Sequence, residues 1–373
     1  MSSESFNPPV RILMGPGPSD VSPRVLLAMA KPTIGHLDPE FIKLLDKIKS
    51  SLQKIFLTKN NTSVLVSGPG SLGMETCFAN LIERTGTKAV VCVNGFFGGR
   101  MKDNIERCGG EAIVVEEEWG RAIDLNKVED SLKSGTDIKV LAFVHAETST
   151  GVLNDAGGLA GLAKKYNCLS VADAVTSLGC VPVKVDEWNI DAVYSCSQKG
   201  LSCPPGLSPI SFSEQAMEYI RARKTKVQNW FLDLTLLMQY WSGEKRAYHH
   251  TAPANAYYGL YEAVQMLLEE GLENSWKRHY ENHLKLKNEL EGIGMEYLVA
   301  EKDRIPNLNA VRIPEGADDL TVRKRLLNDF SLEIGAGLGP LAGKIWRIGL
   351  MGYSSNHRNI SYCVNALKSV LNK

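Results

Sequence analysis

The sequence predicts an α/β protein with a large, doubly wound, mainly parallel sheet and a smaller C-terminal α+β domain. Short β-branched apolar runs alternate with helical patterns from about residue 38 to residue 212, and the pattern changes after Pro253. Such alternation is typical of parallel sheets that are covered by helices. A chain of 373 residues also exceeds one ordinary domain, so two domains are expected.

The first predicted element is a helix that begins at Asp38-Pro39, because Asp caps helices and Pro suits their first turn. Its apolar residues, from Phe41 to Ile55, recur with a period of 3.6. Strands are expected at 63–66, 89–93, 112–115, 139–144, 169–172 and 191–194, with helices at 71–81, 97–108, 125–134 and 157–166. Residues 208–212 are expected to pair back onto the sheet.

After Pro253 the pattern predicts one long helical stretch over 254–292. Strands near 295–299, 308–313 and 345–350 and helices near 318–329 and 355–371 complete an α+β unit. We therefore predict an N-terminal arm over 1–20, a large domain over 21–260 and a small domain over 261–373.

Composition narrows the classes of function. The 42 basic and 42 acidic residues balance, which argues against nucleic-acid or anionic-membrane partners. No apolar run approaches the roughly 18 residues of a membrane span, and no secretory or C-terminal peroxisomal signal is visible, so a cytoplasmic location is expected. The eight cysteines form no Cys-x-x-Cys pair, and the adjacent His249 and His250 lack a nearby carboxylate, so we predict no metal site and reduced thiols.

The candidate catalytic residues are Lys199 and Asp173. Asp173 lies at the end of the predicted strand 169–172, and Lys199 lies in the segment that follows the next predicted strand, 191–194. Ligands of doubly wound sheets lie beyond the carboxyl ends of the strands. An amine there can form a Schiff base with pyridoxal phosphate (PLP), and an acid can keep the pyridine nitrogen protonated. The plain alternatives are a surface lysine and an aspartate that caps a nearby helix.

Other strand ends carry groups that suit the same cofactor. Ser67-Gly-Pro-Gly-Ser71 opens a helix, where free N–H groups and the helix dipole favour an anion, although many such loops are only tight turns. Phe97 offers a ring for stacking, with Phe96 as a competitor and core packing as the alternative. Thr148 offers a hydroxyl. Arg347 lies among apolar neighbours, where a guanidinium needs either a substrate carboxylate or a structural ion pair.

Together these motifs resemble the class V aminotransferases of PLP fold type I, in particular the alanine–glyoxylate and serine–pyruvate branch. The resemblance covers nearly the whole chain. It rests on the following segments: Met14-Gly-Pro-Gly-Pro-Ser19, Gly35-His-Leu-Asp-Pro-Glu-Phe41, His145-Ala-Glu-Thr-Ser-Thr-Gly151, Ser195-Cys-Ser-Gln-Lys199, Tyr248-His-His-Thr-Ala-Pro253, Glu270-Gly-Leu-Glu-Asn-Ser-Trp276, Gly337-Leu-Gly339 and Trp346-Arg-Ile-Gly-Leu-Met-Gly352.

The resemblance implies a role for each candidate residue. Lys199 would form the Schiff base and shuttle the proton, and Asp173 would pair with the pyridine nitrogen. Phe97 stands where relatives often have tryptophan. The remaining cofactor contacts would be Pro69, Gly70, Ser71, Thr148, Val175, Gln198, Tyr248 and Thr251, and the substrate contacts Arg347, Gly17, Gly35 and Thr148. Tyr248 and Thr251 would reach the neighbouring subunit, which implies a homodimer whose N-terminal arms lie at the interface and the active-site entrance.

The implied reaction is a ping-pong transfer of an amino group from L-alanine or L-serine to glyoxylate or pyruvate. Related transaminases that act on ureidoglycine or kynurenine-type substrates share most motifs and stay open. A cysteine desulfurase would need a nucleophilic cysteine late in the chain, whereas 204–362 contains none. A nicotinamide dehydrogenase would fit the Gly68-x-Gly-x-x-Gly73 spacing but would leave Lys199 unexplained. A non-catalytic binding protein of this fold would not need Lys199, Asp173 and Arg347 together.

Overall fold

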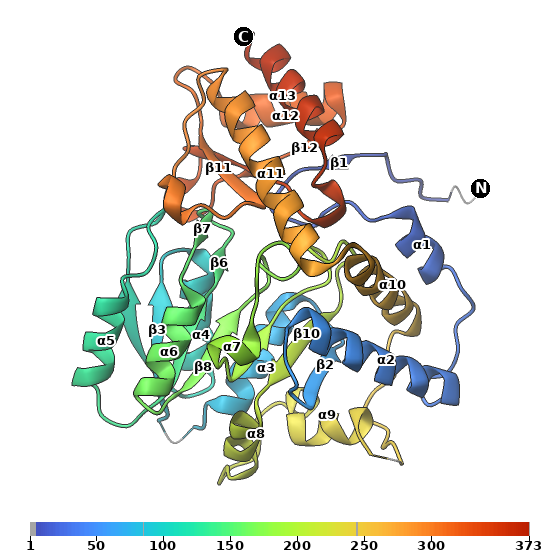
Figure 1. The fold of residues 1–373 in the computed structure, drawn as a ribbon, viewed down its shortest axis with the longest axis vertical. Helices are drawn as coiled ribbons and strands as arrows, with labels where there is room; N and C mark the ends of the chain where they lie inside the picture. Colours follow the sequence, from blue (N-terminus) through green and yellow to red (C-terminus); the bar gives the residue numbers. More distant parts are fainter. Residues whose placement is uncertain (1–4, 85, 244, 373) are drawn as a thin grey trace.

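The protein, described from a computed structural model over residues 5–84, 86–243 and 245–372, is built around a seven-stranded sheet (Figure 1). The strand order is β2-β10-β9-β8-β5-β3-β4. All neighbours are parallel except β10, which runs antiparallel to both β2 and β9. The strands are β2 (Thr62–Val66), β3 (Lys88–Val93), β4 (Glu111–Glu116), β5 (Ile138–Val144), β8 (Leu169–Asp173), β9 (Ala192–Tyr194) and β10 (Ser208–Phe212). The predicted mainly parallel sheet is therefore confirmed, including the returning strand.

Helices cover this sheet and connect its parallel strands. Helix α3 packs beside α4, and α5 packs beside α6, while β2, β5, β8, β9 and β10 are almost wholly buried between the helical layers. The helices of this part are α1 (Pro23–Met29), α2 (Pro39–Ile55), α3 (Gly70–Leu81), α4 (Phe96–Arg107), α5 (Leu125–Ser134), α6 (Ala156–Lys165), α7 (Val185–Trp188), α8 (Glu214–Arg221) and α9 (Leu234–Trp241). A short hairpin joins β6 (Ala146–Glu147) to β7 (Val152–Leu153).

Helix α2 begins where the sequence predicts. The Asp38 side chain accepts a hydrogen bond of 2.8 Å from the backbone N–H of Glu40, and Pro39 occupies the first turn. Its apolar face, which includes Phe41 and Leu52, is buried in the main core.

The small C-terminal part differs from the prediction at two places. The helical stretch is two helices, α10 (Ala254–Glu270) and α11 (Leu272–Glu291), because the chain turns at Gly271 with a φ of 85°, a conformation that an α-helix does not contain. The expected strand at 295–299 is wrong: only a single bridge forms there, between Tyr297 and Val311.

A three-stranded antiparallel sheet and two helices complete this part. Its central strand is β14 (Ile345–Gly349), flanked by β11 (Leu308–Arg312) and β13 (Gly335–Ala336), and its helices are α12 (Asp319–Phe330) and α13 (His357–Leu371). The small domain has its own hydrophobic core around Trp346, separate from the core of the large sheet.

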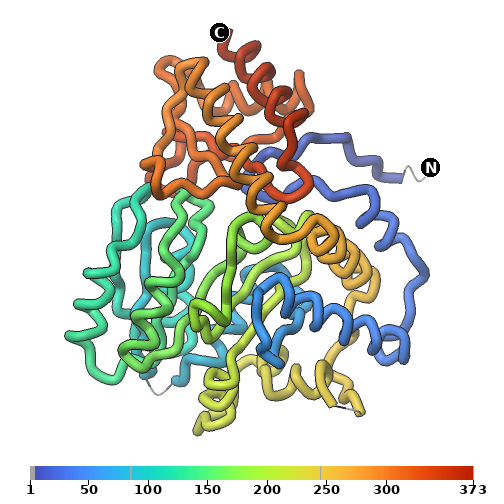
Figure 2. Tube along the Cα trace, viewed as in Figure 1, coloured from blue at the N-terminus to red at the C-terminus, as the bar shows by residue number. Residues whose placement is uncertain are grey.

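The N-terminal segment joins the small domain rather than the large one. Strand β1 (Ile12–Leu13) pairs in parallel with β12 (Leu332–Glu333), and Met14 is buried in the small core. Figures 1 and 2 show this blue segment running beside the red C-terminal elements before the chain enters α1. Gly17 and Ser19 of this segment then lie against Lys199, in the loop that follows β9. The predicted domain limits at residues 20 and 260 stay predictions.

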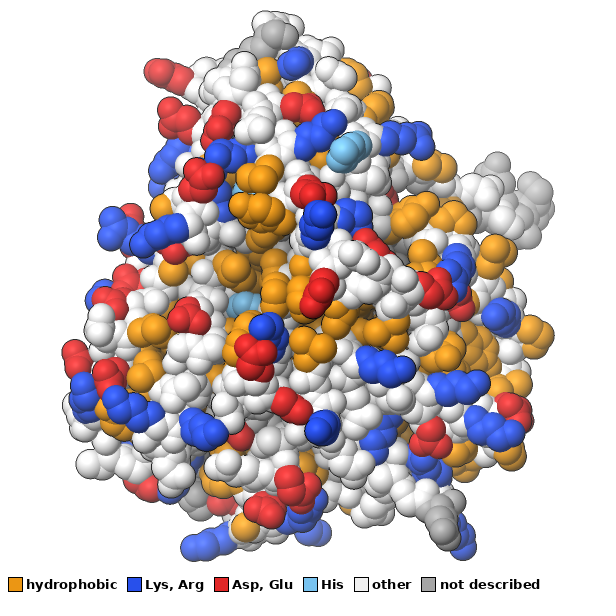
Figure 3. All heavy atoms as spheres, viewed as in Figure 1, with side chains coloured by type: hydrophobic (Ala, Val, Ile, Leu, Met, Phe, Trp, Pro, Cys, Tyr) orange, Lys and Arg blue, Asp and Glu red, His pale blue; other side chains and the backbone are white. Residues whose placement is uncertain are grey.

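The visible surface mixes both signs of charge. On the face shown in Figure 3, basic and acidic side chains are interspersed, and hydrophobic side chains gather where the upper, small part meets the large one. Among the helices of the described ranges, none has the length and apolar character that crossing a membrane requires.

Candidate active site

Lys199 lies in the loop after β9, and its side chain is buried. Its Nζ donates to the hydroxyls of Thr148 at 3.3 Å and Thr176 at 3.2 Å. Burial lowers the pKa of Lys199, because the charged ammonium form loses its hydration. This environment therefore shifts the lysine toward its neutral, nucleophilic form.

The N-terminal segment closes over the same lysine. The Ser19 hydroxyl donates to the backbone oxygen of Lys199 at 2.8 Å. Gly17 has a φ of 112°, and a Cβ there would lie 3.1 Å from the Cγ of Lys199. Glycine is required at this position both by its backbone conformation and by the close approach of the lysine.

Asp173 ends β8 and is held by two donors. The Tyr194 hydroxyl donates to Oδ2 at 2.6 Å, and the backbone N–H of Val175 donates to Oδ1 at 2.8 Å. Burial raises the pKa of Asp173 to about 6, while these two hydrogen bonds act in the opposite direction. The carboxyl therefore lies in a site where a partner with positive charge would favour its ionised form.

Phe97 lies close to Lys199, with its ring centroid 5.7 Å from Nζ. Its position is fixed by Glu147, a fully buried carboxylate that accepts from the backbone N–H groups of Phe97 at 3.1 Å and Gly98 at 3.3 Å. An acid at these free N–H groups suits the first turn of α4. Phe96 is more exposed and packs edge-on against Phe97.

The loop before α3 forms a tight cradle. Pro69 is the extended residue before the helix, and Gly70 is its first residue. A Cβ at Gly70 would lie 2.9 Å from the Cβ of Cys196 and 3.2 Å from Cγ2 of Val175, so only glycine lets the three segments approach this closely. Ser71 follows, with its side chain half-buried.

Arg347 projects from β14 to the other side of Thr148. Its Nη1 donates to the backbone oxygen of Thr148 at 3.1 Å, and its Nε donates to that of Ala336 at 2.7 Å. Burial lowers its pKa to about 10, and the more distant Glu147 acts against this. Within the described ranges no carboxylate forms an ion pair with Arg347, so this buried cation retains capacity for an anion.

Three candidate residues lie apart from this group. Tyr248 is 62% exposed and its ring packs on His36 at a centroid distance of 5.2 Å. Its hydroxyl lies 3.5 Å from Oγ1 of Thr251, which is also exposed. Gly35 is exposed, and a Cβ there would have no neighbour within 4 Å. In the described parts of this chain, none of the three contacts Lys199.

Sequence reasoning missed Thr176, Tyr194 and Ser19. Thr176 could have been predicted, because it follows Asp173 in the same loop. Tyr194 stands directly opposite Asp173 in the register of β8 and β9, so correct strand alignment would have indicated it. The contact between Ser19 and Lys199 depends on the path of the N-terminal segment across the sheet, and no local sequence pattern encodes that path.

The residues present fit PLP. A buried amine, a buried acid and an aromatic ring converge, and the Gly70 cradle leaves no space for a side chain. In addition, the buried Oε1 of Gln198 has no hydrogen-bond partner among the described residues. Because an amide is readily rotated by half a turn, this side chain can offer a donor or an acceptor to a ligand.

Comparison with known proteins agrees with this geometry. A family model described as Aminotransferase class-V matches residues 16–338. The chain is 37% identical to an alanine–glyoxylate aminotransferase of Mus musculus over 372 residues, which is 99% of this chain and 89% of the relative.

Solved structures give the same result. An alanine–glyoxylate aminotransferase from Nostoc superimposes with a TM-score of 0.97 at 44% identity, covering 100% of this chain and 98% of the other. A ureidoglycine–glyoxylate aminotransferase from Bacillus subtilis gives a TM-score of 0.96 at 35% identity, covering 99% and 95%. The chain therefore belongs to the class V aminotransferase family and is a PLP-dependent transaminase of fold type I.

Proposed function

We propose that this enzyme moves an amino group from L-alanine or L-serine to glyoxylate or pyruvate by a ping-pong mechanism. The observation that carries the proposal is that Lys199 and Arg347 both bind Thr148. Its hydroxyl accepts from Nζ of Lys199 at 3.3 Å, and its backbone oxygen accepts from Nη1 of Arg347 at 3.1 Å. A small amino acid carries its carboxylate on the same carbon that must lose a proton. The Arg347 guanidinium, which forms no ion pair within the described ranges, and the buried Lys199 amine match that arrangement.

The proposed mechanism assigns one task to each side chain. PLP, when bound, supplies an aldehyde for the substrate amine and a ring that accepts electrons from the α-carbon. Arg347 binds the substrate α-carboxylate. The Nζ of Lys199 takes the proton from the α-carbon of the amino acid, and in the second half-reaction it gives a proton to the α-carbon of the oxo acid. Thr148 and Thr176 orient this amine, and Ser19 and Gly17 exclude water from its other side.

The cofactor contacts in this proposal are those expected from the sequence. Asp173 pairs with the pyridine nitrogen and Phe97 stacks on the ring. The phosphate is held by Pro69, Gly70, Ser71 and Gln198, with Val175 and Thr148 beside the ring, and Gly35 at the substrate entrance. Tyr248 and Thr251 are exposed and, within the described ranges, do not contact Lys199 of their own chain, which supports a homodimer in which they reach the partner's phosphate. The eight free thiols support a cytoplasmic location.

Ureidoglycine is the second candidate donor. The similarity to the ureidoglycine–glyoxylate aminotransferase of Bacillus subtilis, at 35% identity and a TM-score of 0.96, favours it, since both activities use glyoxylate as the acceptor. A kynurenine-type donor has no comparable support.

A spectral titration tests the proposal. The purified protein is expected to absorb in the visible range, to lose this band with L-alanine or L-serine and to regain it with glyoxylate. Ureidoglycine, added separately, distinguishes the second candidate. The Lys199→Ala variant should bind PLP without forming the band and should lose turnover by about a thousandfold or more.

The control is Lys133→Ala, an exposed lysine on α5, which should leave the spectrum unchanged. Bleaching by ureidoglycine alone would replace the alanine assignment, and substantial turnover by the Lys199 variant would overturn the role of that residue.

A further inference from the structure

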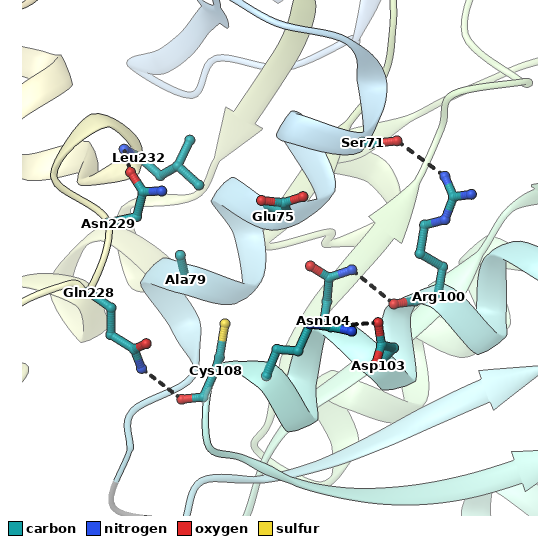
Figure 4. Close-up of a pocket in the computed structure, with 11 residues that line it drawn as sticks. Ser71, Glu75, Ala79, Arg100, Asp103, Asn104, Cys108, Gln228, Asn229 and Leu232 are labelled. Carbon is teal, nitrogen blue, oxygen red and sulfur yellow. Dashed lines mark hydrogen bonds and ion pairs between the residues drawn. The ribbon is translucent and has the colours of Figure 1, made fainter.

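Arg100 lies beside the proposed phosphate cradle, although no motif of the sequence singles it out. It projects from α4 toward the first turn of α3, and its Nη1 donates to the Ser71 hydroxyl at 3.2 Å (Figure 4). The same guanidinium lies 5.1 Å from the ring centroids of both Phe96 and Phe97. One side chain thus contacts both the proposed phosphate ligand Ser71 and the proposed stacking ring Phe97.

This cation has no anionic partner in the described part of the chain. The acidic residues that line the same groove are Glu75 and Asp103, and neither forms an ion pair with Arg100. Asp103 instead pairs with Arg107 at 2.7 Å. Arg100 also lies at the N-terminal end of α3, where the helix dipole is positive, so the two positive features repel one another unless an anion lies between them.

The other proposed phosphate residues supply no charge. Pro69, Gly70, Ser71, Gln198, Tyr248 and Thr251 are all neutral. A phosphate monoester carries close to two negative charges at neutral pH. The Lys199 amine is assigned to the aldehyde of the cofactor, and Arg347, which donates to the backbone oxygen of Thr148, is assigned to the substrate carboxylate, so neither is assigned to the phosphate.

We propose that Arg100 is the cation that neutralises the cofactor phosphate, and that it positions Ser71 and Phe97 for the cofactor at the same time. This inference rests on the proposed roles of Ser71 and Phe97 in PLP binding. Arg100 holds the Ser71 hydroxyl by a hydrogen bond and restrains the Phe97 ring by a cation–π contact, each of which contributes on the order of 1 kcal/mol. Its charge favours the dianionic form of the phosphate.

The test compares PLP with pyridoxal, which lacks the phosphate. Apo protein is titrated with each compound, and binding is followed by protein fluorescence and by visible absorbance. Arg100→Gln is expected to weaken PLP binding by about 10- to 100-fold and to leave pyridoxal binding within about threefold. Arg100→Lys retains the charge and should recover much of the loss. Raising the salt concentration should weaken PLP binding more for the wild type than for Arg100→Gln.

Two controls separate this role from a merely structural one. Arg107→Gln, on the same helix and already paired with Asp103, should leave both affinities unchanged. Equal losses for PLP and pyridoxal in Arg100→Gln would show that Arg100 only supports the fold, and unchanged PLP binding would overturn the proposal outright. Wild-type apo protein that binds no PLP would instead sink the proposed function, so the two failures are distinguishable.

Discussion

At the scale of single residues, Asp173 links the active site to stability. Its pKa rises from the ordinary 3.8 to about 6 because it is buried. The folded protein therefore holds this proton more tightly than the unfolded chain does. The free energy of unfolding is unaffected below about pH 4, falls as pH rises toward 6, and stays lower above that. Asp173→Asn removes the effect, so the apo variant should gain on the order of 3 kcal/mol at pH 7.5 and nothing near pH 4.

Urea unfolding of the apo proteins at both pH values measures this difference. Asp130→Asn, at an exposed position of α5, is the control and should change the free energy of unfolding little at either pH. A gain of the same size at both pH values would contradict the raised pKa. The same variant should bind PLP more weakly, because the neutral amide lacks the charge that a pyridinium nitrogen needs.

The sequence correctly predicted which side chains lie at the strand ends. It did not predict contacts that depend on strand register or on the path of the N-terminal segment over the sheet. Lys199 and Asp173 follow buried strands, so a doubly wound sheet brings them to one edge. That Phe97 rather than Phe96 lies near Lys199 could not be derived from either side chain, because Glu147 of β6 holds the first turn of α4 by a hydrogen bond from the backbone N–H of Phe97. The proposed role of Arg100 was not predicted from the sequence. It depends on the absence of an ion pair to Arg100 within the described ranges, which only three-dimensional distances reveal.

At the scale of elements, the first turn of α3 must lie close to two neighbouring loops. Gly70→Ala would add a Cβ only 2.9 Å from that of Cys196, so the helix must shift away from the Cys196 and Val175 loops. Overpacking of this kind typically costs about 1–3 kcal/mol. Because the shift occurs in the proposed phosphate cradle, we expect PLP affinity to fall by about tenfold or more, measured by titration of the apo protein.

The matched control is Gly161→Ala, in the middle of α6, where a Cβ would have no neighbour within 4 Å. Here alanine should stabilise the protein by about 0.5–1 kcal/mol through helix propensity and should leave PLP binding alone. If Gly70→Ala bound PLP as tightly as the wild type, the cradle would lie elsewhere.

Elements with a strong hydrophobic period were predicted to within a residue or two, for example α2 and β5. The break between α10 and α11 was not predicted, because an isolated glycine in a helical pattern is usually tolerated within the helix. Here the φ of 85° at Gly271 ends α10. The segment at 295–299 is apolar enough for a strand, yet only Tyr297 forms a bridge, with Val311 of β11.

At the scale of the whole molecule, the sequence predicted the large sheet and the small domain but not how the N-terminal segment connects them. Strand β1 pairs with β12 some 320 residues later, and no local pattern carries that information. This pairing positions Gly17 and Ser19 over Lys199. The exposed Tyr248 and Thr251, by contrast, contact His36 and each other but not Lys199 of their own chain within the described ranges, and the proposed homodimer would bring them to the partner's phosphate.

Mixed dimers test whether these residues act across the interface. Lys199→Ala and the double variant Tyr248→Ala, Thr251→Ala are co-expressed with different tags, and the heterodimer is isolated. If Tyr248 and Thr251 serve the partner's phosphate, one site of this heterodimer has an intact lysine and an intact phosphate loop, and the other site has neither. The heterodimer should then show about half of the wild-type activity.

The opposite arrangement gives a different result from the same sample. If Tyr248 and Thr251 served their own site, each site of the heterodimer would carry one defect, and activity would stay at the level of the weak parental variants. Failure to recover any doubly tagged species would contradict the homodimer itself. Restored activity, in contrast, requires both a second copy and a shared site, because neither parental chain contains all of the residues on which turnover depends.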